Sequence, residues 1–276
     1  MKINLPRFFR RLARIIAAIT ILYGLALTFF YFKQEKFFFN PKHLEETYRF
    51  QFSEDFEEIE IEVAEKVALN AVLFKTEMSR GVVLYLHGNA GALHDWGKRA
   101  HLFLNNQYDV LFVDYRGYGK SDGAYTNDGE LFGDVQTVYD YVKTRYEEQN
   151  IVVLGYSLGS GLAAYVAAKN SPRQLILNAP YYSWKTLVAD EIVPPIPKFL
   201  IKYDIKTHEY LQTVRCPVQI FHGTKDLLIA PETNSIPLQQ LFPEKVTLTL
   251  ITDAPHNALH IVKEYQDGLR KVLLGE

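Results

Sequence analysis

Apolar residues form two kinds of pattern along the chain. One uncharged run of 18 residues extends from Ile15 to Phe32, and shorter apolar runs alternate with longer amphipathic stretches after it. As a helix, the long run would span roughly 27 Å, close to the roughly 30 Å hydrocarbon core of a bilayer. We therefore predict a transmembrane anchor over 15–32, between a basic N-terminus (1–14) and a linker near the membrane surface (33–47).

Charges on either side of this run predict its orientation. Residues 1–32 hold five basic and no acidic residues, which leaves 25 basic and 32 acidic residues for the remainder. Because the more basic flank of a membrane helix stays in the cytoplasm, we expect a cytoplasmic N-terminus and a body on the non-cytoplasmic side. A cleaved signal peptide is the alternative, and Gly24-Leu25-Ala26 could serve as its small-x-small cleavage site. The apolar run continues beyond them, which favours an uncleaved anchor.

Residues 48–276 have the pattern of one α/β domain. Eight short runs rich in β-branched residues have strand character, and several are apolar throughout, as expected of parallel strands covered on both faces. They lie at 57–63, 69–74, 81–87, 110–114, 151–156, 174–178, 218–222 and 246–252. Helical patterns lie at 91–105, 128–147, 158–169, 231–241 and 256–273. This alternation predicts a mostly parallel eight-stranded sheet with helices on both faces.

Residues 181–215 fit neither pattern, and three prolines between 194 and 197 break any long helix there. We expect a small cap over the carboxyl edge of the sheet, where open α/β folds bind ligands. Tyr181, Tyr182 and Trp184, at the start of the cap, are candidate substrate-binding residues. The alternative is that these rings only cover the sheet.

The strongest chemical signal is GYSLG at 155–159, which follows a predicted strand and opens a predicted helix. A serine on so tight a turn adopts a strained backbone, and residues two positions away must be small. Gly155 and Gly159 meet this requirement, so Ser157 is the candidate nucleophile. The alternative is a small-residue helix start that packs under a strand.

A nucleophilic serine needs a general base and a carboxylate that orients the base. Loops after two later strands supply both: HGTKD contains Asp226, and DAPHN contains His256. The order serine, aspartate, histidine is the one that α/β-hydrolases use. Asp253, three residues before the histidine, is the alternative acid, and His256 itself could instead cap a helix.

Two backbone amides are candidates for stabilising an oxyanion beside Ser157. The loop HGNAG at 87–91 follows a strand and supplies Asn89, and Leu158 opens the helix after the serine. The alternative for the loop is an ordinary glycine-rich turn.

Composition excludes several other functions. The single cysteine, Cys216, lacks the partners that a disulfide or a zinc site needs, and no cluster of carboxylates and histidines predicts a metal site. The chain has no convincing nucleotide-binding glycine pattern, so we expect no cofactor. The acidic excess after residue 32 argues against nucleic acid as a ligand.

With HGNAG, DYRGYGKSDG, GYSLGSG, HGTKD and PHN in this order, the chain resembles the α/β-hydrolase superfamily. More narrowly, it resembles the single-span, membrane-anchored α/β-hydrolase-domain proteins, whose relatives include protein depalmitoylases and serine peptidases. The resemblance implies that Ser157 is the nucleophile, His256 the base and Asp226 the acid, with the amides of Asn89 and Leu158 as oxyanion donors.

The function that this resemblance implies is a membrane-anchored serine hydrolase that cleaves an ester, thioester or amide through an acyl-enzyme. A carboxylesterase, thioesterase or lipase-like activity is expected. The alternatives are a serine peptidase and a non-catalytic, membrane-anchored binding or scaffold protein on a hydrolase fold. Expected partners are the bilayer and a small-molecule or acylated substrate, and the oligomeric state stays open.

Overall fold

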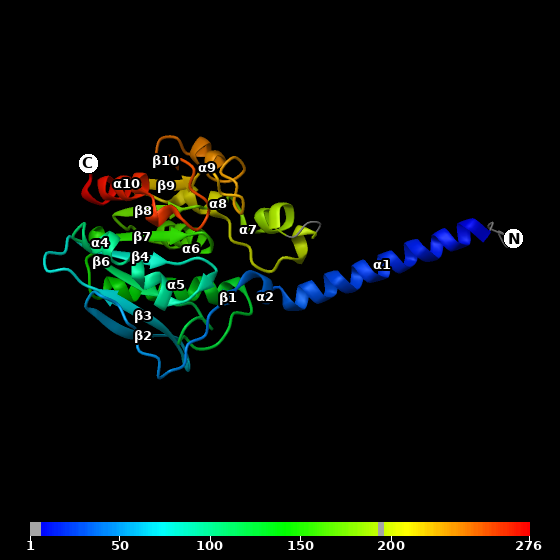
Figure 1. Ribbon diagram of the computed structural model, residues 1–276, viewed down its shortest axis with the longest axis horizontal. Coiled ribbons are helices and arrows are strands. Elements are labelled where there is room, and N and C mark those ends of the chain that lie inside the picture. Colours follow the sequence, from blue (N-terminus) through cyan, green and yellow to red (C-terminus); the bar gives the residue numbers. More distant parts are fainter. Residues whose placement is uncertain (1–6, 193–195) are drawn as a thin grey trace.

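A mixed sheet of eight strands forms the centre of the domain (Figure 1). The computed structural model describes residues 7–192 and 196–276. The strands lie side by side in the order β10-β9-β8-β7-β4-β6-β3-β2. β3 pairs antiparallel with β2 and β6, and every other pair in this order is parallel. The strands are β2 (Phe56–Ala64), β3 (Val67–Phe74), β4 (Val82–Leu86), β6 (Asp109–Val113), β7 (Ile151–Tyr156), β8 (Gln174–Asn178), β9 (Val218–Gly223) and β10 (Val246–Ile251).

The structure confirms the mostly parallel eight-stranded sheet, and each predicted strand lies within two residues of its observed bounds. Helices cover both faces. In β4, Leu84 belongs to the core that α5, α6 and α8 share, whereas Val83 belongs to the core beneath α3, α4 and α10. The helices are α3 (Leu93–Trp96), α4 (His101–Leu104), α5 (Asp128–Lys143), α6 (Leu158–Lys169), α8 (Thr207–Thr213), α9 (Ser235–Leu241) and α10 (Lys263–Leu274).

Four of the five predicted helices are shorter than expected: α5 ends at Lys143, α9 begins at Ser235, and the other two patterns are interrupted. The pattern at 91–105 is divided by a 3-10 turn, Gly97–Arg99, between α3 and α4. The pattern at 256–273 becomes a loop, a 3-10 turn at Leu259–Ile261 and then α10. The first residues of that pattern, His256 among them, therefore lie in a loop beyond β10.

The predicted cap divides into two parts. Residues 181–206 contain α7 (Trp184–Thr186), a π-helical segment (Leu187–Ile192) and a 3-10 turn (Lys198–Leu200). The C-terminal part of the predicted cap is instead α8. This helix packs against α6, and its Leu211 is completely buried. Two of the three prolines lie at 193–195, outside the described residues.

A long helix, α1 (Arg7–Lys33), projects away from the domain (Figure 1). It is long and apolar enough to cross a membrane, and Phe30 is its one buried residue. The predicted basic segment 1–14 and the anchor 15–32 are continuous within it from Arg7 onward, and residues 1–6 lie outside the described residues.

The predicted linker at 33–47 is not a free connection, because the domain binds it closely. It forms α2 (Glu35–Phe38) and a short strand, β1 (Asn40–Pro41), which pairs parallel with β5 (Ala90–Gly91). Gln34 and Phe38 are buried at 0% and 3% exposure. The chain after α1 is thus part of the folded domain, next to the loop that follows β4.

Candidate active site

Ser157 lies on the turn between β7 and α6 with φ at 52°, a conformation that is strained for a residue with a side chain. The two flanking glycines are required by close packing. A Cβ at Gly159 would lie 2.1 Å from the carbonyl oxygen of Leu86, and a Cβ at Gly155 would lie 2.2 Å from that of Gly159. The GYSLG pattern therefore lets the turn pass under its neighbours while the serine projects from the sheet edge.

Ser157, His256 and Asp226 form a chain of hydrogen bonds. Nε2 of His256 lies 3.0 Å from Oγ of Ser157, and Nδ1 of His256 lies 2.6 Å from Oδ2 of Asp226. The three residues follow β7, β10 and β9, whose parallel strands end at the same edge of the sheet. All are buried, with exposures of 7%, 8% and 3% in that order. This arrangement can pass a proton from the hydroxyl to the imidazole.

Asp226 is held by a dense set of donors. The amides of Leu228 and Ile229 donate to Oδ1 at 3.0 and 2.9 Å, and Nε2 of His222 lies 3.1 Å from Oδ2. Burial alone would raise the pKa of Asp226, but the hydrogen bonds from His222, His256 and Ile229 outweigh it and lower this pKa below its ordinary value. The carboxylate therefore stays charged beside His256.

Asp253, the alternative acid, lies elsewhere. Its carboxylate forms an ion pair of 2.8 Å with Lys225 on the surface, and its side chain is 70% exposed. Of the two carboxylates that the sequence offers, only Asp226 contacts His256 in the structure.

The loop after β4 lies against Ser157. A Cβ at Gly88 would come within 3.5 Å of the Ser157 Cβ, and Asn89 lines the same cavity as Ser157. The carbonyl of Asn89 accepts from the amide of Asn40 at 2.9 Å and from the hydroxyl of Tyr118 at 2.8 Å. These two bonds hold the Asn89 carbonyl in place and so help to fix the orientation of the loop.

A buried pair supports the same loop from below. Nε2 of His87 lies 3.2 Å from Oδ1 of Asp114, and both side chains are completely buried. Oδ2 of Asp114 accepts from the amide of Leu93 at 3.1 Å. Burial raises the pKa of Asp114, and the nearby His87 partly offsets this increase.

The first amides of a helix have no partner within it, which leaves the Leu158 amide available beside Ser157.

A small apolar cavity of about 110 Å³ opens beside Ser157. Of the three rings predicted to bind substrate, only Trp184 lines it. Tyr181 does not line it, because this residue is completely buried and donates its hydroxyl to the carbonyl of Leu158 at 3.1 Å. Tyr182 does not line it either, and its ring stacks on His208 with centroids 4.3 Å apart.

Sequence reasoning missed most of the cavity wall. Besides Asn89, Ser157 and Trp184, the wall is made by Phe37, Phe38, Leu187, Leu228 and Ile229. The FFF run at 37–39 was a visible signal, because three aromatic residues directly after an anchor are unusual in a solvated linker.

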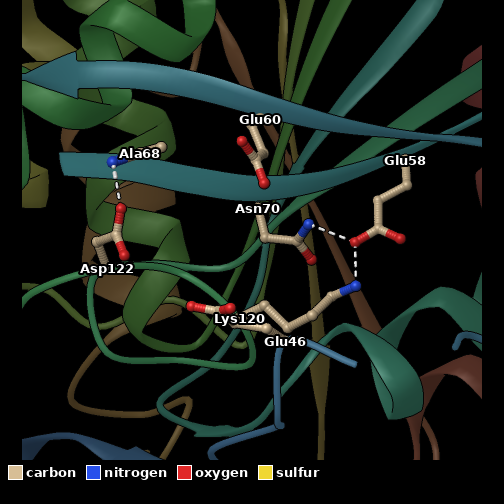
Figure 2. Close-up of a pocket in the computed structure, with 7 residues that line it drawn as sticks. All are labelled: Glu46, Glu58, Glu60, Ala68, Asn70, Lys120 and Asp122. Atoms are coloured by element: carbon tan, nitrogen blue, oxygen red, sulfur yellow. Dashed lines mark hydrogen bonds and ion pairs between the residues drawn. The ribbon is translucent and has the colours of Figure 1, made fainter. Parts of the chain in front are cut away.

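A second, polar pocket lies over β2 and β3 and shares no residue with the Ser157 cavity (Figure 2). Its volume is about 440 Å³, and several of its polar groups pair with one another. Glu58 accepts from Asn70 at 2.8 Å and forms an ion pair with Lys120, while Asp122 accepts from the amide of Ala68 at 2.9 Å. Across residues 7–192 and 196–276 no group of three or more His, Cys, Asp or Glu residues could hold a metal ion.

Comparison with known proteins finds similarity to α/β hydrolases in both sequence and structure. A family model described as "Serine aminopeptidase, S33" matches residues 77–213, which include Asn89 and Ser157 but end before Asp226 and His256. Protein bem46 of Schizosaccharomyces pombe is 31% identical over 193 residues, covering 66% of this chain and 64% of that protein. The lysophosphatidylserine lipase ABHD12 of Danio rerio is 27% identical over 173 residues, covering 55% and 45%.

The chain thus spans about half to two-thirds of the length of these curated relatives. Among solved structures, the esterase Pf2001 of Pyrococcus furiosus superposes with a TM-score of 0.66 at 22% identity, covering 86% of this chain and 98% of that one. At this identity the likeness establishes the fold.

Proposed function

We propose that the chain is a membrane-tethered serine hydrolase of the α/β-hydrolase superfamily, and that it cleaves a carboxylic ester or thioester through an acyl-enzyme; its similarity to a hydrolase family model, to bem46 and to an esterase structure supports this. One observation carries the proposal: the unbroken hydrogen-bond chain from Ser157 through His256 to Asp226. A nucleophile, a base and an orienting carboxylate in contact are the parts that acyl transfer requires.

In this mechanism His256 removes the proton of the Ser157 hydroxyl through Nε2 while Oγ attacks the substrate carbonyl carbon. The negative charge on the carbonyl oxygen is stabilised by the amides of Asn89 and Leu158. When the tetrahedral intermediate collapses, His256 gives its proton to the departing alcohol or thiol. Water, deprotonated by the same histidine, then attacks the acyl-enzyme, and the acid leaves with Ser157 reprotonated. Asp226 stabilises the imidazolium in both halves of the cycle.

The chemistry of the cavity supports an acyl ester over a peptide. An aminopeptidase substrate carries a cationic α-amino group, which needs a carboxylate or other acceptors close to the scissile bond. The described lining residues are apolar or aromatic except for Asn89 and Ser157, and none of them is acidic. Such a wall suits the hydrocarbon of an acyl group.

We further propose that α1 anchors the enzyme with residues 1–14 in the cytoplasm and residues 15–32 across the bilayer. The catalytic domain, including the segment 33–47 that packs on it, would then lie on the non-cytoplasmic side. The basic residues of α1 before Ile15 support this direction. Protease treatment of sealed vesicles of known sidedness tests it, and cleavage of the domain from the cytoplasmic face would reverse the orientation.

A fluorophosphonate probe tests the catalytic assignment in the full chain. Labelling is expected in the native protein and in Ser160→Ala, and it should disappear in Ser157→Ala. Ser160 is a matched control because its hydroxyl lies one helical turn away and donates to the carbonyl of Ser157 at 2.6 Å. Labelling that survives Ser157→Ala would refute the nucleophile, and absence of labelling in the native protein would favour a non-catalytic binding protein. A panel of p-nitrophenyl esters and peptide amides then separates esterase from peptidase activity.

A further inference from the structure

Gln34 joins the end of α1 to the domain. Its side chain is completely buried, and its Nε2 donates to the carbonyls of Tyr31 and Leu200, both at 3.1 Å. Its Oε1 accepts from the amide of Lys202 at 2.9 Å. The Lys202 ammonium forms an ion pair of 2.9 Å with Glu35. A glutamine with both ends of its amide bound to backbone groups fixes the last turn of α1 against the segment 200–202.

An aromatic cluster continues from this clamp to the active site. The ring of Phe30, in α1, lies 5.8 Å from that of Phe38, which lies 5.4 Å from Trp184 and 6.0 Å from Tyr203. Phe38 and Trp184 also form part of the Ser157 cavity wall. The buried end of the apolar helix and the wall of the cavity are thus a single packed unit.

Several exposed apolar side chains of the domain lie at the cavity or beside α1. Among the described residues after α1, the large apolar side chains that are exposed are Phe37, Met78, Phe199, Leu227, Leu228, Leu241, Leu250 and Ile261. Phe37 and Leu228 line the cavity, and Leu227, which is 97% exposed, adjoins Leu228. Phe199, which is 82% exposed, borders a groove against α1 with Leu27 and Phe32. Four of these eight side chains therefore line the cavity, adjoin its wall in the chain or border the groove beside α1.

We propose that the Gln34 clamp holds the mouth of the cavity against the membrane surface, so that Phe199 and Leu227 dock into the bilayer and the site draws acyl esters from lipid rather than from water. This inference rests on the proposed hydrolase function. Continuity of the apolar surface with α1 identifies the bilayer as its partner, since a surface next to a spanning helix is already at the interface. Gln34 acts here as a positioning residue and makes no contact with the substrate.

Hydrolysis of two esters by the full chain in phosphatidylcholine vesicles tests the proposal. One ester is water-soluble p-nitrophenyl butyrate, and the other is 4-methylumbelliferyl oleate dissolved in the bilayer. Phe199→Asp combined with Leu227→Asp should lower the ratio of oleate to butyrate hydrolysis about tenfold, because charged side chains resist insertion. Neither residue lines the cavity, so butyrate hydrolysis should not change, and Met78→Asp, at an exposed position outside this surface, should alter neither rate.

Gln34→Leu should lower the same ratio, because the domain loses its fixed orientation on α1. An unchanged ratio in the double variant would overturn the docking surface, and an unchanged ratio in an active Gln34→Leu protein would overturn the clamp. If Gln34→Leu does not fold, the double variant still decides the docking surface. A native protein that hydrolyses neither ester and escapes the fluorophosphonate probe would instead refute the proposed function.

A second measurement does not depend on activity. Leu227→Cys and Met78→Cys, made in separate proteins, each carry an environment-sensitive fluorophore. The buried native Cys216 is poorly reactive because burial raises the pKa of its thiol to about 11. Brominated lipids should quench the probe at 227 and not the probe at 78. Quenching at 227 should fall when Gln34→Leu is added. Equal quenching at both positions would show that the surface does not dock.

Discussion

Nδ1 of His256 donates to Oδ2 of Asp226 across 2.6 Å, and this bond turns the other ring nitrogen toward Ser157. Asp226→Asn should lower kcat for p-nitrophenyl butyrate by about 10³–10⁴-fold, because an amide at this position favours the wrong imidazole tautomer. Asp253→Asn is the matched control, since its carboxylate pairs with Lys225 at the surface and should leave kcat unchanged. A larger loss of kcat in Asp253→Asn than in Asp226→Asn would instead make Asp253 the carboxylate that orients His256.

Gly159 lies so close to the end of β4 that no side chain fits there. Gly159→Ala should destabilise the protein by about 1–3 kcal/mol or more, because its Cβ would overlap the Leu86 carbonyl oxygen and backbone must move. Gly133, within α5, has open space around it, so Gly133→Ala should stabilise the protein by about 0.5–1 kcal/mol. Urea midpoints of the two variants in one detergent measure both effects. A Gly159→Ala midpoint equal to that of the native protein would contradict the close packing.

Leu228 lines the Ser157 cavity and is also exposed to solvent. Leu228→Phe, at a side chain that is 46% exposed, should be tolerated by the fold and should narrow the approach to Ser157. We expect kcat/KM for p-nitrophenyl octanoate to fall about tenfold relative to that for the acetate, because one misfit in an apolar pocket costs about 1–3 kcal/mol. Leu241→Phe, at a comparably exposed position outside the cavity, should leave the ratio of octanoate to acetate unchanged. An equal loss for both esters would place the acyl chain elsewhere.

The fold could be predicted largely because its inner strands are buried on both faces. β4 and β7 are buried at every position, so they read as continuous apolar runs with sharp ends. The helix after β4 was harder, because its pattern does not show the 3-10 turn at Gly97–Arg99 that divides it. In the irregular cap no repeating pattern assigns faces, so the burial of Tyr181 and the different packing of Tyr182 could not be foreseen.

Part of the candidate active site could likewise be predicted from the sequence, and part could not. Ser157, Asp226 and His256 could be proposed because each follows a strand that ends at the same edge, and local motifs mark the positions. The cavity wall could not, because Phe37 and Phe38 come from about 120 residues earlier and reach the site only after the segment 33–47 packs on the domain. The amino-acid composition of residues 33–47 does not distinguish an exposed linker from a segment packed on the domain. Gln34 shows the difficulty, because its contacts with Leu200 and Lys202 join residues far apart in the sequence.

His260 predicts how stability depends on pH. Burial, followed by the nearby charges of Arg99 and His101, lowers the pKa of His260 to about 4, whereas an unfolded histidine titrates near 6.5. Between about pH 6.5 and 4 the unfolded chain therefore binds a proton that the folded chain does not, so this group makes stability fall as the pH falls through that window. Above about pH 6.5 His260 is neutral in both the folded and the unfolded state, so this loss of stability is absent there.

His260→Gln removes this titration, so the urea midpoint should decrease less between pH 7 and 4.5 than it does in the native protein. His43→Gln, at an exposed position, is the control and should retain the native pH dependence. Chemical unfolding of the three proteins at both pH values, in the same detergent, gives the comparison. If His260→Gln and the native protein lose the same stability on acidification, the folded state accepts a proton at His260 as readily as the unfolded state does, and its burial has no consequence for stability.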